Sequence, residues 1–306
     1  MSELTHAGKY FATARERYRI KLKRDAGEPW PWTNDVHLKT WSFTNVHRED
    51  DRTTTWLRQN LRDPISNSHD ENCAFLLGGV SESSCNCSVK LRVFKAVLIF
   101  RWFNRISTGE IIKDLILGTW DKAEAYRRLK DVKPVVTGAY IIKAGDGVSK
   151  LEGILNCIEE AEPYLPRMVK KWGDSLERAW EDLKELHYMG PFMAYEVITD
   201  LRFTPVLCNA KDIMTWGNLG PGAIRGMSWV VHNNADSFAN SKTQQKQMLA
   251  WMAELLEMTK DEKYWPQAWP KWEMHEVEMW LCEHAKYMRA YNGISQKRRY
   301  HPGGND

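Results

Sequence analysis

The sequence predicts a mostly α-helical fold. Apolar residues recur every three to four positions in one segment after another, which is the period of an amphipathic helix. The alternation typical of strands is scarce, and residues 134–143 are the best candidate for one. No fixed repeat period indicates a solenoid. We therefore expect a single helical domain over residues 1–306, packed as one or two lobes.

Composition supports a globular intracellular protein. With 306 residues, 43% hydrophobic and 27% charged, the chain can bury a sizeable core and is not expected to be disordered. Six scattered cysteines indicate reduced thiols and a cytoplasmic location. The sequence has no long apolar run, so we expect no signal peptide and no membrane partner. The net charge of +3 alone does not indicate nucleic-acid binding. Fifteen tryptophans serve either as core anchors or as stacking platforms.

The N-terminal third of the chain predicts three helices. Residues 7–25 form a basic amphipathic helix that stops at Gly27 and a Pro-Trp-Pro-Trp turn. A second helix over 48–62 ends at Asp63-Pro64, because the residue before a proline disfavours helix. Residues 64–90 are mostly polar and predict a loop-rich insertion. Residues 91–106 are strongly apolar and too long for one strand, which favours helix.

The remainder of the chain predicts one helix after another. Asp121 and Asp174 have the character of N-caps for two of them. The expected helices cover residues 108–117, 121–130, 148–161, 174–187, 191–200, 243–258 and 272–290.

A first functional motif is LKELHYMGPFMAYEVITD, residues 183–200. A helix ends at the tight turn Met189-Gly190-Pro191 and a second helix starts at once, which is the pattern of a helix-hairpin-helix. Such a turn presents backbone N–H groups to a nucleic-acid phosphate. An ordinary helix–helix turn is the alternative. Asp212 follows Gly190 by 22 residues, beyond an apolar stretch.

A second motif is GNLGPGAIRGMSW, residues 217–229. Gly220 and Gly222 predict a loop whose backbone can approach a ligand closely, and Arg225 offers a planar fork to phosphate oxygens. No Gly-Lys-Ser/Thr follows, so the segment is not a Walker A loop. A structural turn with a surface arginine is the alternative.

A third motif is WSFTNVHREDDRTTTWL, residues 41–57. Arg48 and Arg52 are four residues apart on a predicted helix, with Asp50 and Asp51 beside them. This arrangement suits a phosphate clamp or a carboxylate–metal site. A solvated, salt-bridged helix face explains it equally.

A fourth motif is WEMHEVEMWLCEHAKYMRAYNG, residues 272–293, which is followed by Lys297-Arg298-Arg299-Tyr300. On a helix Glu278, Cys282 and Lys286 share one stripe that could line a cleft. Ordinary Glu–Lys pairing on an exposed face is the alternative.

Metal and hydrolase signatures are absent from the sequence. His69, Cys73, Cys85 and Cys87 have neither CxxC spacing nor a second pair, so we expect no zinc site. No GxSxG, HExxH or triad-like signature appears.

The hairpin followed by Asp212 is similar to the helix-hairpin-helix DNA glycosylases of base excision, in which a catalytic aspartate follows the hairpin. Phe192 stands where lyase-type members carry a Schiff-base lysine, so lyase activity is not expected. Over nearly the whole chain, from about residue 10 to 302, the sequence resembles the amino acid:DNA transferases of bacteriophages, the α-glutamyl/putrescinyl thymine pyrophosphorylase family. The segments that carry this resemblance are FTNVHREDDRTTTWL, TGAYII, MGPF, GPGAIRG and EVEMWLCEHAKY…KRRY.

The resemblance implies a glycosylase-like helical fold and an enzyme of thymidine hypermodification. In such pathways a kinase converts 5-hydroxymethyl-deoxyuridine in DNA to a pyrophosphate ester, and the transferase replaces pyrophosphate with an amino acid, such as glycine, or a polyamine. The implied partners are double-stranded DNA containing modified thymidine and a free amine. The implied location is the cytoplasm of an infected bacterium.

That reaction assigns a role to each candidate residue. Asp212 is the first choice for the base that deprotonates the amine, and Glu278 is the second. We expect the modified base to be flipped out of the duplex. Mg²⁺ is the only cofactor that the pyrophosphate suggests, and no metal ligands can be read from the sequence. Pyrophosphate is assigned to Arg48, Arg52, Gly220, Gly222 and Arg225; DNA to Met189, Gly190, Pro191, Arg298 and Arg299; the substrate pocket to Asn45, Tyr140, Trp216, Cys282 and Lys286.

Two other functions fit the same residues. One is a DNA glycosylase-like enzyme that excises a modified pyrimidine by means of the hairpin and Asp212. The other is a non-catalytic DNA-binding module that recruits other modification enzymes.

Overall fold

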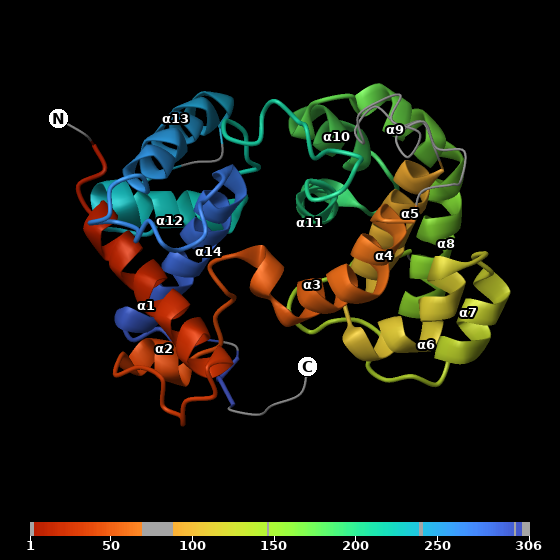
Figure 1. The fold of residues 1–306 in the computed structure, drawn as a ribbon, viewed down its shortest axis with the longest axis horizontal. Coiled ribbons are helices and arrows are strands. Elements are labelled where there is room, and N and C mark those ends of the chain that lie inside the picture. The colour runs from red at the N-terminus through yellow and green to blue at the C-terminus, as the bar shows by residue number, and fades with distance from the viewer. Residues whose placement is uncertain (1–2, 69–87, 146, 239–240, 297, 302–306) are drawn as a thin grey trace. The chain divides into compact units, whose positions relative to one another are not determined.

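The computed structural model describes residues 3–68, 88–145, 147–238, 241–296 and 298–301, and its elements are helices (Figure 1). The only β-type pairing among these residues is one antiparallel bridge between Trp41 and Arg299. The prediction of a mostly α fold is therefore confirmed. The chain divides into two compact units: unit 1 is Met1–Asp51 with Ile213–Asn305, and unit 2 is Arg52–Asp212.

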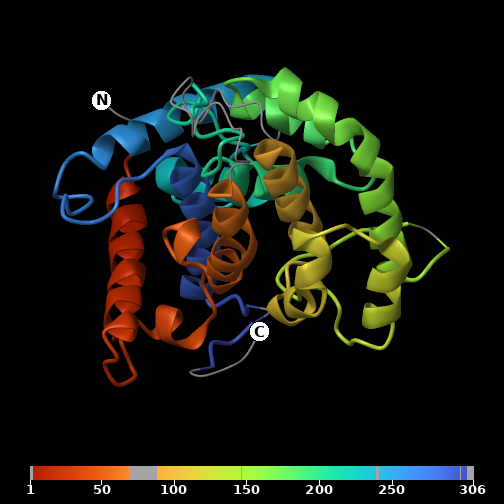
Figure 2. The same cartoon turned by 45° about the vertical axis from the view of Figure 1, so that its right-hand side comes forward.

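Unit 1 is built around the long helix α14. Helices α1, α2, α12 and α13 all pack against it, and Figure 2 shows the red α1 beside the blue α14. The core includes Tyr10 and Phe11 from α1, Met227 from α12, Met252 from α13 and Trp280 from α14. The helices are α1 (Ala7–Asp25), α2 (Val36–Thr40), the 3-10 turn η1 (Arg48–Asp50), α12 (Pro221–His232), α13 (Lys242–Met258) and α14 (Met274–Tyr291).

Two glycines allow α12 to lie directly against α14. A Cβ on Gly226 would be 2.0 Å from the carbonyl oxygen of Leu281, and a Cβ on Gly222 would be 2.8 Å from Cys282 Sγ. The prediction of an open glycine-rich loop is therefore wrong from Pro221 onward. Gly220 is the N-cap and Pro221 is in the first turn, where its missing N–H costs no hydrogen bond.

Unit 2 is organised around the apolar helix α5, which packs against α4, α6, α8, α9 and α11. Its elements are α3 (Arg52–Leu57), the π-helical turn η2 (Arg58–Arg62), α4 (Asp63–Ser66), α5 (Val89–Phe103), α6 (Ile106–Leu117), α7 (Lys122–Leu129), α8 (Lys150–Ala161), η4 (Glu162–Tyr164), α9 (Leu165–Trp172), α10 (Leu176–Leu183) and α11 (Gly190–Leu201).

A buried ion pair joins α5 to α11. The guanidinium of Arg101 donates from Nε to Asp200 Oδ2 at 2.5 Å and from Nη2 to Asp200 Oδ1 at 2.8 Å. The same guanidinium donates to Asn104 Oδ1 at 2.6 Å and to Thr54 Oγ1 at 2.9 Å. Arg101 is 2% and Asp200 0% exposed, so the pair depends on these hydrogen bonds in place of water.

Most expected helices are present with small shifts at their ends. Asp121 caps α7 as predicted, since its carboxylate accepts from the backbone N–H of Glu124 at 3.0 Å. Ser175, not Asp174, caps α10. The helical path continues past Asp63-Pro64 to Ser66, because Pro64 occupies the first turn of α4.

Other expectations fail or lie outside the described residues. Residues 134–143 are turns and irregular backbone rather than a strand, and α9 was not expected. Of the proposed insertion at 64–90, residues 69–87, which contain His69 and the three cysteines nearby, lie outside the described part of the chain. Among the helices that the structure describes, none combines the length and apolarity needed to cross a bilayer.

Candidate functional site

Polar side chains are concentrated inside unit 1, where the segment 43–51 passes between α1 and α14. Asn45, His47 and Arg48 are 4–7% exposed. Groups of this kind are rarely buried without a structural or chemical role. We refer to these residues together as the polar cluster: Arg17, Asn45, His47, Arg48, Asp51, His275, Glu276, Glu278, Cys282 and Glu283.

Asn45 fixes the conformation of the segment 43–51. Its backbone N–H donates to Asp51 Oδ1 at 2.8 Å, and its side-chain Nδ2 donates to the carbonyl of Asp50 at 2.7 Å. Its Oδ1 accepts from Arg17 Nη2 at 2.7 Å. The neighbouring Thr44 N–H donates to a carboxylate of α14, Glu283, at 3.0 Å. Asn45, proposed as a pocket residue, therefore has a clear positioning role.

Asp51 has the properties of a base that works near neutral pH. Burial raises the pKa of its carboxyl, while the Asn45 N–H and the charges of Arg48 and Arg17 oppose that effect, and the result is a pKa of about 6. A group with such a pKa is ionised at pH 7 and still accepts a proton readily. The sequence indicated Asp51 only as a neighbour of the arginines, because nothing in the pattern showed its burial.

Glu276 differs from Asp51, because its pKa is lowered rather than raised. Its Oε1 lies 2.6 Å from His275 Nε2 and 3.5 Å from His47 Nδ1. Burial alone would raise the pKa of Glu276, but the two imidazoles outweigh burial and hold the pKa at about 2. Glu276 therefore stays ionised and orients the two histidines instead of exchanging protons.

Glu278 and Cys282 meet on the side of α14 that faces α12. Glu278 is 8% exposed, and its Oε1 lies 3.6 Å from Cys282 Sγ. Burial, and next the charge of Glu278, raise the pKa of Tyr10 well above its usual value. Gly222 brings the first turn of α12 against the thiol. The buried carboxylate of Glu278 thus contacts a thiol, Cys282, that packs against the start of α12.

Lys286 follows Cys282 by one turn of α14, on the predicted stripe, and has its own partners. Its ammonium pairs with Glu283 at 3.3 Å and lies 4.8 Å from the centre of the Phe43 ring. Lys286 therefore pairs with Glu283 of the polar cluster and packs against the segment 43–51.

Asp212 caps a helix in unit 2. Its carboxylate accepts hydrogen bonds from Ser175 Oγ at 2.8 Å, Leu176 N at 2.8 Å and Glu177 N at 3.0 Å. These bonds hold the first turn of α10. Asp212, the first choice for the base, thus has its carboxylate engaged by the first turn of α10, and its role as the base stays a prediction.

The proposed arginine clamp is not formed on one helix. Arg48 is buried in η1, the backbone is extended at Asp51, and Arg52 is exposed at the start of α3. Arg225 is exposed on α12, where its Nε lies 3.7 Å from Asp236 Oδ1. Only Arg48 of these three belongs to the polar cluster.

The proposed hairpin lies between α10 and α11 in unit 2. Met189 is 2% exposed, Gly190 has a φ of +61°, and the carbonyl of Pro191 accepts from Trp180 Nε1 at 2.9 Å. Phe192 is half exposed and makes an edge-to-face contact with Tyr140, with ring centroids 4.9 Å apart.

The two proposed stacking residues differ in exposure and position. Trp216 is 8% exposed, so its ring offers little open surface. Tyr140 instead lies beside the hairpin through Phe192.

Arg298 and Arg299 lie on the C-terminal segment of unit 1. The Ser42 N–H donates to the carbonyl of Arg298 at 3.1 Å, and the Arg299 guanidinium lies 5.7 Å from the centre of the Trp41 ring. Both side chains are exposed. Across the residues that the structure describes, no group of three or more His, Cys, Asp or Glu side chains could hold a metal ion.

Comparison with known proteins places these features in a family. The family model described as "5-hmdU DNA kinase, helical domain" matches residues 5–75 and 65–296. The chain belongs to this family. A curated relative, the 5-hmdU DNA kinase of Bacillus phage SP10, is 26% identical over 312 residues, which cover 92% of this chain and 45% of the relative. The chain thus spans less than half the length of that relative. No solved structure matches.

The family agrees at a coarse level with the one expected from the motifs, a phage family of thymidine-hypermodification enzymes. Amino acid transfer and the hairpin-glycosylase fold remain predictions. Within unit 1, four residues that the motifs singled out lie in the polar cluster: Asn45, Arg48, Glu278 and Cys282. Sequence reasoning missed Arg17, His47, Glu276 and Glu283, which come from ordinary amphipathic patterns.

Proposed function

We propose that this chain is a transferase of thymidine hypermodification in phage DNA. It would attach an amino acid or a polyamine to the 5-methylene carbon of 5-pyrophosphoryloxymethyl-deoxyuridine. Family membership supports action on DNA bearing 5-hydroxymethyl-deoxyuridine or its derivatives. The printed sequence has no Gly-Lys-Ser/Thr triplet, so it lacks the phosphate loop expected of a P-loop kinase.

The observation that carries the proposal is Asp51, a carboxyl with a pKa of about 6 beside Arg17 and Arg48. The incoming ammonium transfers a proton to a carboxylate, either Asp51 or Glu278. The amine nitrogen then forms a bond to the methylene carbon while the carbon–oxygen bond breaks. Pyrophosphate leaves with that electron pair, and the guanidinium groups of Arg17 and Arg48 balance the developing charge.

DNA would be bound with the modified base extruded from the helix, since a stacked base cannot reach buried groups. The Met189-Gly190-Pro191 hairpin is the proposed phosphate contact, within a glycosylase-like helix-hairpin-helix. The proposed partners are double-stranded modified DNA and a free amine, with Mg²⁺ accompanying pyrophosphate. The proposed location is the cytoplasm of the infected host.

A second candidate function is a module that holds modified DNA for a kinase. The name of the matching family model and the 45% coverage of the phage SP10 relative favour it. This module would bind the same DNA without forming a carbon–nitrogen bond.

The test is incubation of the purified chain with DNA containing 5-pyrophosphoryloxymethyl-uracil and a panel of amines. Digested nucleosides are then analysed by mass spectrometry. An aminomethylated nucleoside together with free pyrophosphate supports transfer. Binding without a product supports the module, and a released base with abasic DNA supports a glycosylase.

A further inference from the structure

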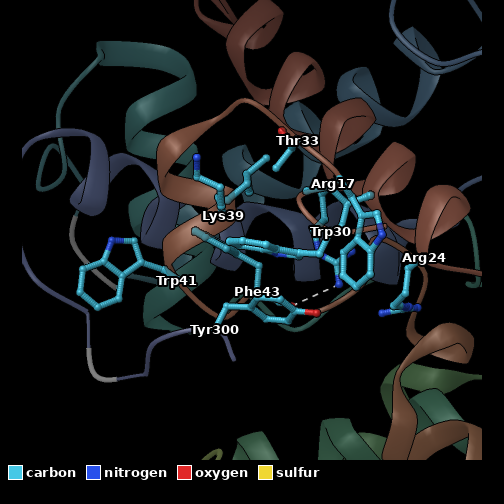
Figure 3. Close-up of a pocket in the computed structure, with 11 residues that line it drawn as sticks. Arg17, Arg24, Trp30, Thr33, Lys39, Trp41, Phe43 and Tyr300 are labelled. Carbon is cyan, nitrogen blue, oxygen red and sulfur yellow. Dashed lines mark hydrogen bonds between the residues drawn. The ribbon is translucent and has the colours of Figure 1, made fainter. Parts of the chain in front are cut away.

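A pocket of unit 1 is lined by Arg17 but by none of the carboxylates of the polar cluster. It is lined by the turn after α1, the end of α2, Phe43 and Tyr300 (Figure 3). None of the described residues that line it is acidic. Its ligand is therefore expected to be neutral or anionic.

Aromatic rings form much of the pocket wall. Trp30 is 46% exposed, which is unusual for the largest apolar side chain. Trp32 is held by a hydrogen bond from its Nε1 to the carbonyl of Glu28 at 2.7 Å, and its ring lies edge-on to Tyr300 at 6.3 Å. Trp41 lines the same pocket. Fixed rings of this kind are suitable platforms for stacking a planar base.

Cationic groups share the pocket with these rings. Arg24 and Lys39 line it and are partly exposed, and Arg24 is paired with Asp25 at 3.1 Å. The buried Arg17 uses Nη2 to bond Asn45 and the carbonyl of Phe43. Its Nη1 is buried and has no hydrogen-bond partner among the described residues. An unsatisfied buried donor is costly, and an acceptor oxygen from a ligand would satisfy it.

The C-terminal segment is fixed at the pocket by backbone hydrogen bonds. The Tyr300 N–H donates to the carbonyl of Thr40 at 2.9 Å, and the Ser42 N–H donates to that of Arg298. This pairing holds Tyr300 in the wall and places the exposed Arg298 and Arg299 in the chain beside it.

The cavity has a volume of about 30 Å³, which admits phosphate oxygens but not a base. We propose that it binds the phosphate of one nucleotide at Arg17, Arg24 and Lys39, with the base stacked on the exposed ring of Trp30 at its rim. An amine co-substrate is disfavoured because its ammonium would find no carboxylate in the wall. The pocket shares Arg17 with the proposed transfer site, but the binding test below requires no transfer reaction. The nucleotide could belong to a DNA strand or be free, and the experiment distinguishes these sources.

The test measures binding of the full chain to a fluorescent single-stranded oligothymidylate by anisotropy, with free thymidine 5′-monophosphate as a competitor. Trp30→Ala is expected to weaken binding about 5- to 100-fold, since it removes a stacking surface. Trp30→Phe should restore most of the affinity. Competition by micromolar monophosphate would identify a free nucleotide, and its failure to compete would identify a strand.

Charge is tested with the double variant Arg24→Ala/Lys39→Ala. It should reduce the slope of log affinity against log salt by roughly 1.4, because two phosphate contacts to a single strand are lost. Matched controls are Tyr164→Ala, which removes an exposed aromatic ring from unit 2, and Lys260→Ala, which removes an exposed cation from unit 1. Equal binding by the pocket variants and the controls would overturn the proposal. Far-UV circular dichroism verifies that each variant is folded.

Discussion

At the scale of single residues, two buried carboxyls in the same cluster have opposite properties. Asp51 has a pKa of about 6 because burial outweighs its cationic neighbours, whereas Glu276 has a pKa of about 2 because two histidines outweigh burial. The sequence showed that both are acidic. The sequence could not predict which imidazole or guanidinium would lie next to each carboxyl. His47 and Glu276, for example, are in contact although more than 200 positions separate them in the sequence.

Replacing Asp51 with asparagine tests its role as the base. Asn keeps an oxygen for the Asn45 N–H but cannot accept the proton, so kcat/KM should fall about 100-fold or more. In the wild type, activity should rise with pH through about 6 as Asp51 ionises, and the variant should lose this dependence. Both are measured as pH–rate profiles with a fixed concentration of the protonated amine, the form that gives its proton to the base.

Asp50→Asn is the matched control, since this neighbour is partly exposed and pairs with Lys21 at 3.3 Å. It should retain near wild-type activity. Because the pKa of Asp51 is raised in the folded state, its ionised form costs stability above pH 6, so Asp51→Asn should not lower Tm. An unchanged pH–rate profile in Asp51→Asn would assign the base to another group.

Glu276→Gln tests the carboxylate that orients two histidines. Breaking a buried charge pair should destabilise the protein by about 3–5 kcal/mol at pH 7. The folded pKa lies below the usual value, so the wild type should lose this stability as pH falls from about 4.5 to 2, and the variant should not. Urea unfolding across that range measures the difference.

Glu257→Gln is the control for that experiment, because Glu257 pairs with Lys260 on an exposed surface. It should change the free energy of unfolding by no more than about 0.5 kcal/mol. Equal effects of the two substitutions would show that Glu276 is not a structural anchor.

At the scale of elements, the contact between α12 and α14 explains why two sequence motifs belong together. The glycines of GPGAIRG make room for LCEH on the facing helix. The sequence indicated that these glycines matter but suggested a loop, because glycine is a poor helix former. The apolar spacing of Ala223, Met227 and Val230 was a helical signal within the same segment.

Gly226→Ala tests this close packing. The new Cβ would meet the backbone of Leu281, which cannot rotate away, so the helices must separate. We expect a loss of about 1–3 kcal/mol in the free energy of unfolding. Gly8→Ala, where a Cβ has open space in α1, should be neutral or stabilising by up to about 1 kcal/mol. If both variants had the same stability, the glycines would not be required for packing.

Unit 2 has its own test in the Arg101–Asp200 pair. Arg101→Ala should cost about 3–5 kcal/mol, because it leaves Asp200 charged and buried. Arg127→Ala removes an arginine whose pair with Glu124 is exposed and should lower the stability much less than Arg101→Ala. Chemical denaturation measures both, and a loss below 1 kcal/mol for Arg101→Ala would contradict this account of the α5–α11 contact.

At the scale of the whole molecule, unit 1 is assembled from both ends of the sequence. Residues up to 51 and residues from 213 onward form one polar cluster. The helical class and most helices were predictable from local patterns. The cluster was not, because it depends on which distant helices pack together. The tryptophans illustrate this limit, since Trp272 is 2% exposed and Trp30 46%, although both are flanked by polar and proline-rich sequence.

The most direct test of the central claim follows the amine nitrogen. The chain is incubated with DNA containing 5-pyrophosphoryloxymethyl-uracil and a ¹⁵N-labelled amine, and the nucleosides are analysed by mass spectrometry. We predict a ¹⁵N-containing 5-aminomethyl-type nucleoside and an equal amount of pyrophosphate. Both products should be lost in the variant that removes the base, which is either Asp51→Asn or Glu278→Gln. An unlabelled, unchanged nucleoside, or a free base with abasic DNA, would contradict the proposal.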